Sequence, residues 1–424
     1  MSLIKNSLWN LAGYAIPSLI AVPALGLLAR YLGVERFGIF TLALAIVGYA
    51  SIFDAGLTRA VVREIAIYKK DKNEINNIIS SSSVCVAILG IIGAATIILC
   101  SDTIVLMLKV STQYYSEVHL SIKILGLTLP FFLLTQVWCS ILEGYERFGT
   151  LNIQKSVSSS LLMGLPALFV ILLHSSLVYA IVGLLVGRLC SLIIIFYVCR
   201  GSIISAGWRV KKKTLLRMIG FGGWITVSNI ISPVMAYFDR FVLSYFLGAG
   251  TVALYTVPSE AISRLTIFPG ALARTVFPRL SQADSFDFYY HIYTRSQRIM
   301  LVLCLPIVLV GVFFSTPILT LWMGAEYAGE PSVILKILLV GFLFNSLAQI
   351  PFCSIQAFGK AKVTALIHLL EVVPYFLLFY FLMINYSFVG AAIAWSVRMF
   401  FDYLVLMCSN KYLMKKRNGH MTFK

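Results

Sequence analysis

Charged side chains stand inside long apolar stretches of this sequence, where hydrocarbon rather than water would surround them. Seven of them are basic and four are acidic: Lys123, Arg188, Arg240, Arg264, Arg274, Lys336 and Arg398, and Asp239, Glu260, Glu371 and Asp402. A charge at the bilayer centre costs at least about 2.5–3.5 kcal/mol on insertion scales, so it normally faces protein or water and marks a functional site. The excess of bases predicts a positively charged interior.

Arg188 and Arg240 are the strongest candidates for binding an anion. Asp239 is adjacent to Arg240, about 100° round a helix from it, and Arg188 has no acid nearby in the sequence. A guanidinium binds phosphate oxygens through two hydrogen bonds and keeps its proton. These two residues therefore predict a cavity that an anionic ligand visits, and a carboxylate on another helix, such as Glu371, is the alternative partner.

The other intramembrane charges admit two interpretations. Glu260 and Arg264 are four residues apart, as are Arg398 and Asp402, so each pair could neutralise itself on one helix face. Alternatively, their arginines join the anion-binding set. Intramembrane carboxyl groups are also typical of proton relays, which makes Asp239, Glu260 and Glu371 candidates to carry a coupling proton.

Composition places these groups in a multi-pass membrane protein. Of the 424 residues, 59% are hydrophobic and only 12% are charged, and an apolar run of about 20 residues spans a bilayer as a helix. Twelve such runs are predicted, approximately at 8–29, 38–57, 79–101, 119–142, 156–174, 177–199, 218–246, 252–278, 299–320, 332–355, 363–384 and 388–409. We expect an all-α polytopic membrane protein. Its loops are short and hold no extramembrane catalytic module, so we expect no enzyme.

The net charge of +17 is distributed unevenly among the loops. With twelve spans, the loops of one side carry most of the lysines and arginines, whereas the other side holds only Arg30, Arg36 and Lys109. The positive-inside rule then predicts that both termini are cytoplasmic. The basic loops suit anionic lipid head groups as well, and this placement argues against nucleic acid.

Metal and cofactor sites are not expected. The eight cysteines are scattered without a C-x-x-C motif, and the five histidines show no ligand spacing. We interpret the cysteines as small apolar packing residues.

An internal repeat divides the chain. Residues 121–148 align without gaps to residues 334–361, a shift of 213 that matches Gln136 with Gln349, and Arg188 meets Arg398 at a shift of 210. We therefore predict two pseudo-symmetric six-helix lobes, at residues 1–208 and 209–410, followed by a basic cytoplasmic tail at 411–424. Gly183 and Gly187 form a G-x-x-x-G pattern that predicts close helix packing.

Four stretches together resemble a known family. They are the opening segment at 7–66, "ILEGYERF" at 141–148, "YFDRFVLSYFLG" at 237–248 and "VGAAIAWSVRM" at 389–399. The chain resembles, along essentially its whole length, the Wzx-like polysaccharide and O-antigen flippases of the multidrug, oligosaccharidyl-lipid and polysaccharide exporter superfamily.

The resemblance implies a fold, a cargo and partners. The fold would be a V-shaped pair of six-helix lobes that works by alternating access. The cargo would be an oligosaccharide on undecaprenyl diphosphate, moved from the cytoplasmic to the periplasmic leaflet in lipopolysaccharide or other surface-glycan biosynthesis. The polymerase and chain-length proteins of the same pathway would be partners. The family's cationic cavity maps here onto Arg188, Arg240, Arg264, Arg398 and Arg274.

Two other functions remain as alternatives. A drug exporter of the same superfamily would carry a cationic cargo and favour an acidic cavity, whereas this interior is basic. A membrane glycosyltransferase or polymerase of surface polysaccharide would need larger outer loops to hold catalytic groups.

Overall fold

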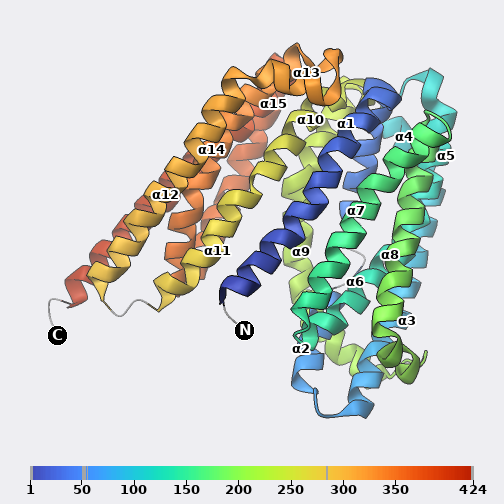
Figure 1. Ribbon diagram of the computed structural model, residues 1–424, viewed down its shortest axis with the longest axis horizontal. Helices are drawn as coiled ribbons and strands as arrows, with labels where there is room; N and C mark the ends of the chain where they lie inside the picture. Colours follow the sequence, from blue (N-terminus) through green and yellow to red (C-terminus); the bar gives the residue numbers. More distant parts are fainter. Residues whose placement is uncertain (1–2, 50–53, 55, 283–284, 422–424) are drawn as a thin grey trace. The chain divides into compact units, whose positions relative to one another are not determined.

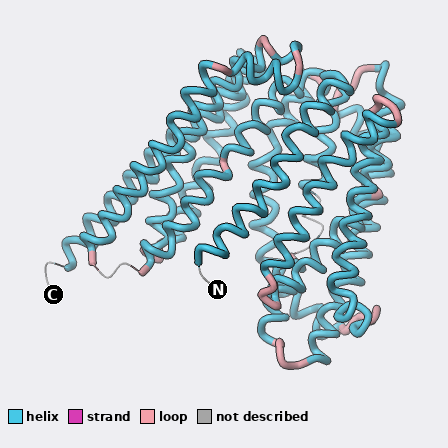
Figure 2. The backbone as a smooth tube through the Cα atoms, in the orientation of Figure 1, coloured by secondary structure: helices cyan, strands magenta, loops and turns pink. Residues whose placement is uncertain are grey.

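A computed structural model gives the backbone of residues 3–49, 54, 56–282 and 285–421. The side chains of 3–16, 221–237, 278, 361 and 417–421 lie outside the described part, which includes the start of the first predicted span and much of the predicted span at 218–246. Within the described ranges every regular element is a helix (Figure 2), so the predicted all-α class is confirmed.

The chain forms two compact units, residues Met1–Ala253 and Leu254–Lys424. The predicted lobe boundary at residues 208/209 stays a prediction, as does the separate tail from residue 411, where the last helix simply continues to Met421.

The first unit consists of helices and one 3₁₀ turn (Figure 1). They are α1 (Leu3–Tyr49), α2 (Leu57–Ile67), α3 (Lys72–Leu99), α4 (Ser101–Met107), η2 (Thr112–Tyr114), α5 (Tyr115–Gly126), α6 (Thr128–Gly144), α7 (Phe148–Leu172), α8 (Leu177–Ala206), α9 (Lys212–Leu247) and the start of α10 (Ala249–Leu265). Because α7 packs against α1 and α8, and α6 packs against α3 and α8, the helices form a closed bundle. The short α2 packs against α6, α9 and α3 at one end of it.

Two glycines bring α8 close to α7. A Cβ atom on Gly183 would lie 2.7 Å from Pro166 Cα, and one on Gly187 would lie 3.2 Å from the Leu161 carbonyl oxygen. Only glycine permits such an approach of two helix backbones, so the predicted close packing at this G-x-x-x-G is confirmed. The contact also fixes the rotation of α8, which decides where the next residue, Arg188, points.

Ion pairs hold α2, α3 and α9 together at one end of the first unit. Glu64 on α2 is almost fully buried and lies 2.6 Å from the Arg217 Nε and 3.0 Å from an Arg63 guanidinium nitrogen. Arg217 also reaches Glu74 on α3 at 2.6 Å, and its guanidinium covers the Tyr68 ring. Since each carboxylate has a guanidinium partner, the burial of Glu64 is compensated.

The second unit is built around one long helix. Its elements are the rest of α10, α11 (Ile267–Ser281), α12 (Phe286–Phe313), α13 (Ser315–Met323), η3 (Ala325–Tyr327), α14 (Glu330–Ala357) and α15 (Ala361–Met421). Helix α14 packs against α11, α12 and α15. Helix α15 breaks at Tyr386 and Ser387, whose backbone angles are not helical, and its two halves return alongside each other.

The predicted count of twelve spans is not confirmed exactly by length and apolarity, a criterion that applies here to the described residues alone. Eight helices in the described part are long and apolar enough to cross a membrane: 17–49, 72–99, 112–144, 148–172, 177–206, 286–313, 330–357 and 362–416. The first and last of these contain the break at Gly33 and the break at Tyr386, so each covers two predicted spans. Helices α10 and α11, with 17 and 15 residues, divide the predicted span at 252–278 into shorter pieces.

Candidate functional site: two arginine centres and a polar cavity

Arg188 lies inside α8, and its guanidinium covers an aromatic ring of the neighbouring α6. Its Cζ is 4.5 Å from the centroid of Phe132, a cation–π distance. Gly187 faces α7, so the next residue, about 100° further round the helix, is directed away from α7. The Arg188 Nε is buried without a hydrogen-bond acceptor, and in the described part of the chain no carboxylate pairs with this arginine. The centre therefore has an unused donor and an uncompensated charge.

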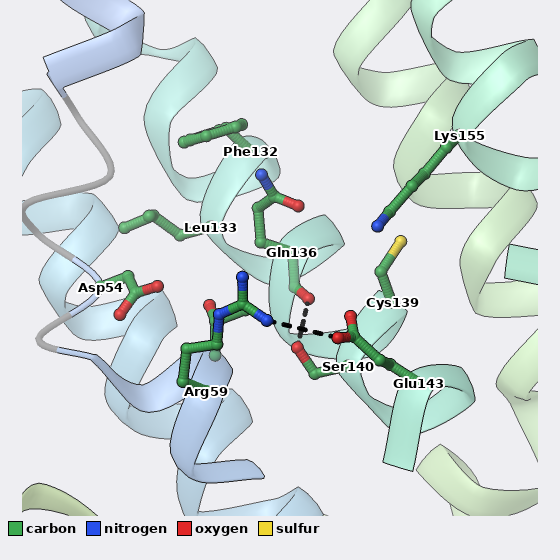
Figure 3. A pocket seen from close by; sticks show the side chains of 10 residues that line it. Asp54, Arg59, Phe132, Leu133, Gln136, Cys139, Ser140, Glu143 and Lys155 are labelled. Atoms are coloured by element: carbon green, nitrogen blue, oxygen red, sulfur yellow. Dashed lines mark hydrogen bonds and ion pairs between the residues drawn. The ribbon is translucent and has the colours of Figure 1, made fainter. Parts of the chain in front are cut away.

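A cavity of about 230 Å³ begins at the same Phe132 and continues along α6 (Figure 3). One face of α6 supplies most of its wall, because residues spaced three or four apart lie above each other on a helix. The start of α2 and the second turn of α7 supply the rest. The lining residues are Asp54, Thr58, Arg59, Phe132, Leu133, Gln136, Cys139, Ser140, Glu143 and Lys155.

Charges of both signs meet in this cavity. Arg59 on α2 donates to Glu143 on α6 across 3.3 Å, and Lys155 reaches towards the same region from α7 (Figure 3). Asp54 is only 7% exposed, and burial raises the pKa of its carboxyl group. The Asp54 carboxylate faces the Thr58 hydroxyl and the backbone N–H groups of Gly56, Leu57 and Thr58, although its Oδ1 and the Thr58 hydroxyl form no hydrogen bond of good geometry. Unsatisfied buried polar atoms are costly, so the cavity offers free hydrogen-bonding positions to a polar ligand.

Asp239 and Arg240 lie near the end of α9, also in the first unit. Arg240 is 5% exposed, and its backbone N–H donates to Asp239 Oδ1 across 2.8 Å. Both side chains take part in further interactions within the protein. The adjacent carboxylate thus turns back to the Arg240 backbone.

Glu260 and Arg264 form the expected pair on one face of α10. The Arg264 Nη2 lies 3.6 Å from Glu260 Oε2, with about a third of the arginine side chain exposed. The Arg264 Nε is buried without a hydrogen-bond partner. Arg274, on α11, is exposed and has a further interaction within the protein.

Arg398 stands in a cluster of four ionisable side chains at the fold of α15. Its Nε is 3.8 Å from Glu371 Oε2, and the Nδ1 of His368 is 3.7 Å from both Glu371 Oε2 and Asp402 Oδ1. The Arg398 guanidinium covers the Tyr375 ring at 4.9 Å. The Asp402 side chain is only 8% exposed and His368 is 40% exposed, so the cluster is buried on one side and accessible on the other.

The charges of this cluster leave room for one proton. With His368 neutral, one guanidinium faces two carboxylates, a net charge of −1, and one added proton makes the set neutral. Isolated charge is costly inside a membrane, so the neutral set with one added proton is the less costly of the two. The ligand atoms of His368, Glu371 and Asp402 all lie within 4.8 Å of one another, the geometry of a metal site. However, the Arg398 guanidinium already approaches the same Glu371 oxygen, which disfavours a second cation there.

The structure decides between several sequence interpretations. Arg398 could pair with Asp402 on its own helix face or join the anion-binding set, but its ion-pair partner is Glu371, because the two halves of α15 lie side by side. Glu371 was also the alternative partner for Arg188 or Arg240, whereas it meets Arg398. No metal-ligand spacing was visible among the histidines, yet His368 meets Asp402, 34 positions further along the chain.

Several contributors had not been identified from the sequence. Gln136 and Asp402 were noted only as a repeat match and a pairing acid, and Phe132 and His368 were not singled out. The matched Gln136 and Gln349 were a usable signal, because polar matches between apolar segments are rarely accidental. The i,i+3 spacing of His368 and Glu371 was another.

Sequence comparison identifies relatives along nearly the whole chain. Residues 3–284 match the model of the family described as "Polysaccharide biosynthesis protein". A Shigella flexneri protein named "Putative O-antigen transporter" is 48% identical over 415 residues, which cover 96% of this chain and 99% of that protein.

Two solved structures share the fold at low sequence identity. A multidrug resistance MATE family transporter of the MOP superfamily, in an inward-facing conformation, superimposes with a TM-score of 0.76 and 17% identity over 96% of this chain and 94% of that one. The lipid II flippase MurJ, in an inward closed conformation, gives a TM-score of 0.76 and 16% identity over 95% and 87%. The fold is thus that of the multidrug and lipid-flipping transporters, and with the apolar helices and the sequence match it follows that this multi-pass membrane chain belongs to the polysaccharide biosynthesis protein family.

Proposed function

We propose that this protein is a flippase for an oligosaccharide linked to undecaprenyl diphosphate, the repeat unit of O-antigen or a similar surface glycan. The head group of such a lipid is anionic and carries many hydroxyl groups, so it cannot cross hydrocarbon unaided. The similarity to a protein named as an O-antigen transporter supports this cargo, and the fold shared with a lipid II flippase supports the movement of a lipid-linked substrate.

The observation that carries the proposal is the Arg188 centre. A buried guanidinium with an unused Nε and no carboxylate partner among the described residues is costly unless a ligand completes it. A diphosphate supplies both the charge and the acceptor oxygens. Phe132 holds the planar group in position, since it covers one face of the guanidinium.

The other proposed cargo-binding arginines differ in how available they are. Arg240 is buried in the first unit, whereas Arg264 and Arg398 already have carboxylate partners in the second. Arg274 is exposed on α11. A single cationic cavity made of all five remains a prediction, and Arg188 is the member with the clearest role in binding the diphosphate.

Proton coupling is assigned to the cluster around Glu371. Its net charge changes from −1 to 0 with one proton, and the accessible His368 provides an entry for that proton. Helix α14 packs against α15, which carries the cluster, and its charged residues are Glu330 and Lys336, both in its first two turns. Glu260, already paired with Arg264, and Asp239 are weaker candidates. If the diphosphate draws Arg398 away from Glu371, the two carboxylates of the cluster lose their guanidinium and take up a proton more readily. Cargo binding and proton uptake would then be linked.

The membrane arrangement is proposed from charge. The basic loops favour a cytoplasmic location of both termini and an inner bacterial membrane. The cargo would then be loaded from the cytoplasmic leaflet, released to the periplasmic leaflet by alternating access, and passed to a polymerase and chain-length protein. Anionic membrane lipids would contact the basic loops.

Deletion of the gene tests the function directly. We expect loss of surface glycan together with accumulation of lipid-linked repeat units in the inner leaflet, measured by mass spectrometry of extracted lipids. Wild-type protein should restore the glycan, and Arg188→Glu at equal expression should not. Loss of chain length alone would indicate a polymerase, and an unchanged glycan with altered drug sensitivity would indicate a drug exporter.

A further inference from the structure

We propose that the cavity between α2, α6 and α7 is a monosaccharide subsite, which holds the sugar ring of the cargo next to the diphosphate. This inference rests on the proposed function, because it names the part of the cargo that the cavity recognises. It assigns to the first unit a second role beside charge neutralisation, namely selection of the glycan.

The size of the cavity suits one sugar ring. A volume of about 230 Å³ corresponds to roughly seven or eight water molecules at about 30 Å³ each. Drug-sized pockets begin at about 300 Å³, so this space is too small for an oligosaccharide and much larger than a single ion requires. One ring, with the remaining sugars outside, is the unit that fits.

The charge of the wall favours a neutral ligand with many hydroxyl groups. Arg59 and Lys155 are balanced by Asp54 and Glu143, so the formal charge of the lining is zero. A phosphate here would face two carboxylates, and a cation would face two bases. Sugar hydroxyls donate and accept at once, so they can satisfy both kinds of group.

Open hydrogen-bonding positions are present on the wall. Asp54 Oδ1 and the Thr58 hydroxyl line the wall without a hydrogen bond of good geometry, and Asp54 is only 7% exposed. Ser140 donates to the backbone carbonyl oxygen of Gln136, and no hydrogen bond among the described residues engages the Gln136 side-chain amide. Figure 3 shows the Gln136 side chain beside the cavity, between Phe132 and the charged residues.

Phe132 connects this cavity to the Arg188 centre. The same ring that lines the cavity lies 4.5 Å from the Arg188 guanidinium. A diphosphate bound by Arg188 would therefore place the directly attached sugar at the cavity, one aromatic ring away. Along α6 the order is Phe132, Gln136, Ser140 and Glu143, successive positions on one face that lead to the end of the helix.

Binding measurements on purified protein in lipid nanodiscs test the subsite. The two probes are bare undecaprenyl diphosphate and the host's own lipid-linked oligosaccharide, extracted from a strain that lacks the gene. We expect the wild-type protein to bind the glycolipid more tightly than the bare carrier. Gln136→Ala should reduce that ratio about three- to tenfold, the loss of one hydrogen bond, and leave affinity for the bare carrier unchanged.

Matched variants separate the subsite from general damage. Gln349→Ala, the repeat counterpart in the second unit, should change neither affinity, and Lys155→Gln alters an exposed side chain of the cavity without threatening the fold. Arg188→Gln should weaken both probes. Melting temperatures of all variants identify any that fail to fold, and Lys155→Gln then carries the test.

The outcomes distinguish the two proposals. If wild-type protein binds both probes equally, or if Gln136→Ala and Lys155→Gln weaken both probes by the same factor, the monosaccharide subsite is wrong while the flippase proposal stands. If wild-type protein binds neither probe, the proposed function itself is wrong.

Discussion

Arg188 and Arg398 occupy matched positions in the internal repeat, yet their surroundings differ in one respect. Both guanidinium groups cover an aromatic ring, Phe132 at 4.5 Å and Tyr375 at 4.9 Å, and both have a buried Nε without a hydrogen-bond acceptor. Arg398 has Glu371 at 3.8 Å, whereas no carboxylate in the described residues pairs with Arg188. The aromatic ring is thus the shared support of the arginine, and the carboxylate decides whether the charge is available to a ligand.

Arginines at matched positions of the sequence repeat can thus suit two different tasks. A guanidinium without a carboxylate is suited to an anion that comes and goes. One that already neutralises Glu371, with His368 and Asp402 beside it, is suited to control how many protons the cluster holds. Charge balance rather than the arginine itself separates the two tasks.

Removal of either arginine should give the largest difference between the two centres. Arg398→Ala leaves Glu371 and Asp402 without their guanidinium and should lower the free energy of unfolding by about 3 kcal/mol. Arg188→Ala leaves no carboxylate behind and should change stability little, while glycan export falls about 10- to 100-fold through lost charge-assisted hydrogen bonds. Thermal unfolding in detergent and surface-glycan assays measure both.

A double variant is the control for that prediction. Arg398→Ala combined with Glu371→Gln should regain most of the lost stability, because the unpaired charge is removed. Equal destabilisation by Arg188→Ala and Arg398→Ala would refute the distinction between the two centres.

The proton dependence of the second centre gives the next largest effect. Glu371→Gln leaves Arg398 and Asp402 balanced without an added proton, so transport in vesicles should lose its response to an imposed pH gradient, about a tenfold change or 1.4 kcal/mol. Glu330→Gln, at the far end of α14, should retain the response. A gradient response that survives in Glu371→Gln would remove this cluster from the coupling mechanism.

The close contact of α7 and α8 should contribute a smaller amount. A methyl group on Gly183 would lie 2.7 Å from Pro166 Cα, so Gly183→Ala should destabilise the first unit by about 1–3 kcal/mol. Gly201, on the same helix, has open space at the Cβ position, and Gly201→Ala should be neutral or stabilising by up to about 1 kcal/mol. Thermal melting of the two variants compares them, and equal melting temperatures would contradict the packing argument.

The pair on α10 should show the smallest effect. Arg264 and Glu260 are partly exposed at 3.6 Å, so Arg264→Gln should change the free energy of unfolding by less than about 1 kcal/mol. Export should fall less than in Arg188→Gln, because Arg264 already has a carboxylate. A larger export defect in Arg264→Gln would make this residue, rather than Arg188, the main contact of the diphosphate.

Much of the fold followed from local pattern. Apolar runs predicted the helices, and Gly183 with Gly187 predicted the contact of α8 with α7. The count of twelve is not confirmed exactly: the breaks at Gly33 and Tyr386 fall between predicted spans, whereas α10 ends after 17 residues, inside the predicted span at 252–278. Apolarity reports the solvent of a segment, whereas a break in the backbone depends on a few residues.

The candidate site was predicted only in part. Arg188 and Glu371 stood out because a charge in an apolar run is conspicuous, but the pairing of Arg398 with Glu371 was not predicted. Ion pairing between spans leaves no periodic trace in the sequence, which offered only the nearer carboxylate, Asp402, as a possible partner on the same helix face. The cavity beside Gln136 joins three helices and is equally invisible to a local pattern.

Long apolar runs that contain charges were enough to predict a chain that enters a membrane as helices and retains buried charges, since both follow from the cost of exposing backbone and side chains to hydrocarbon. Which charges meet depends on how the helices pack. His368 and Asp402 are 34 positions apart and come within 3.7 Å because α15 folds back at Tyr386 and Ser387. Electrostatic energy depends on distance in space, and that distance is set by how helices pack rather than by their spacing along the chain.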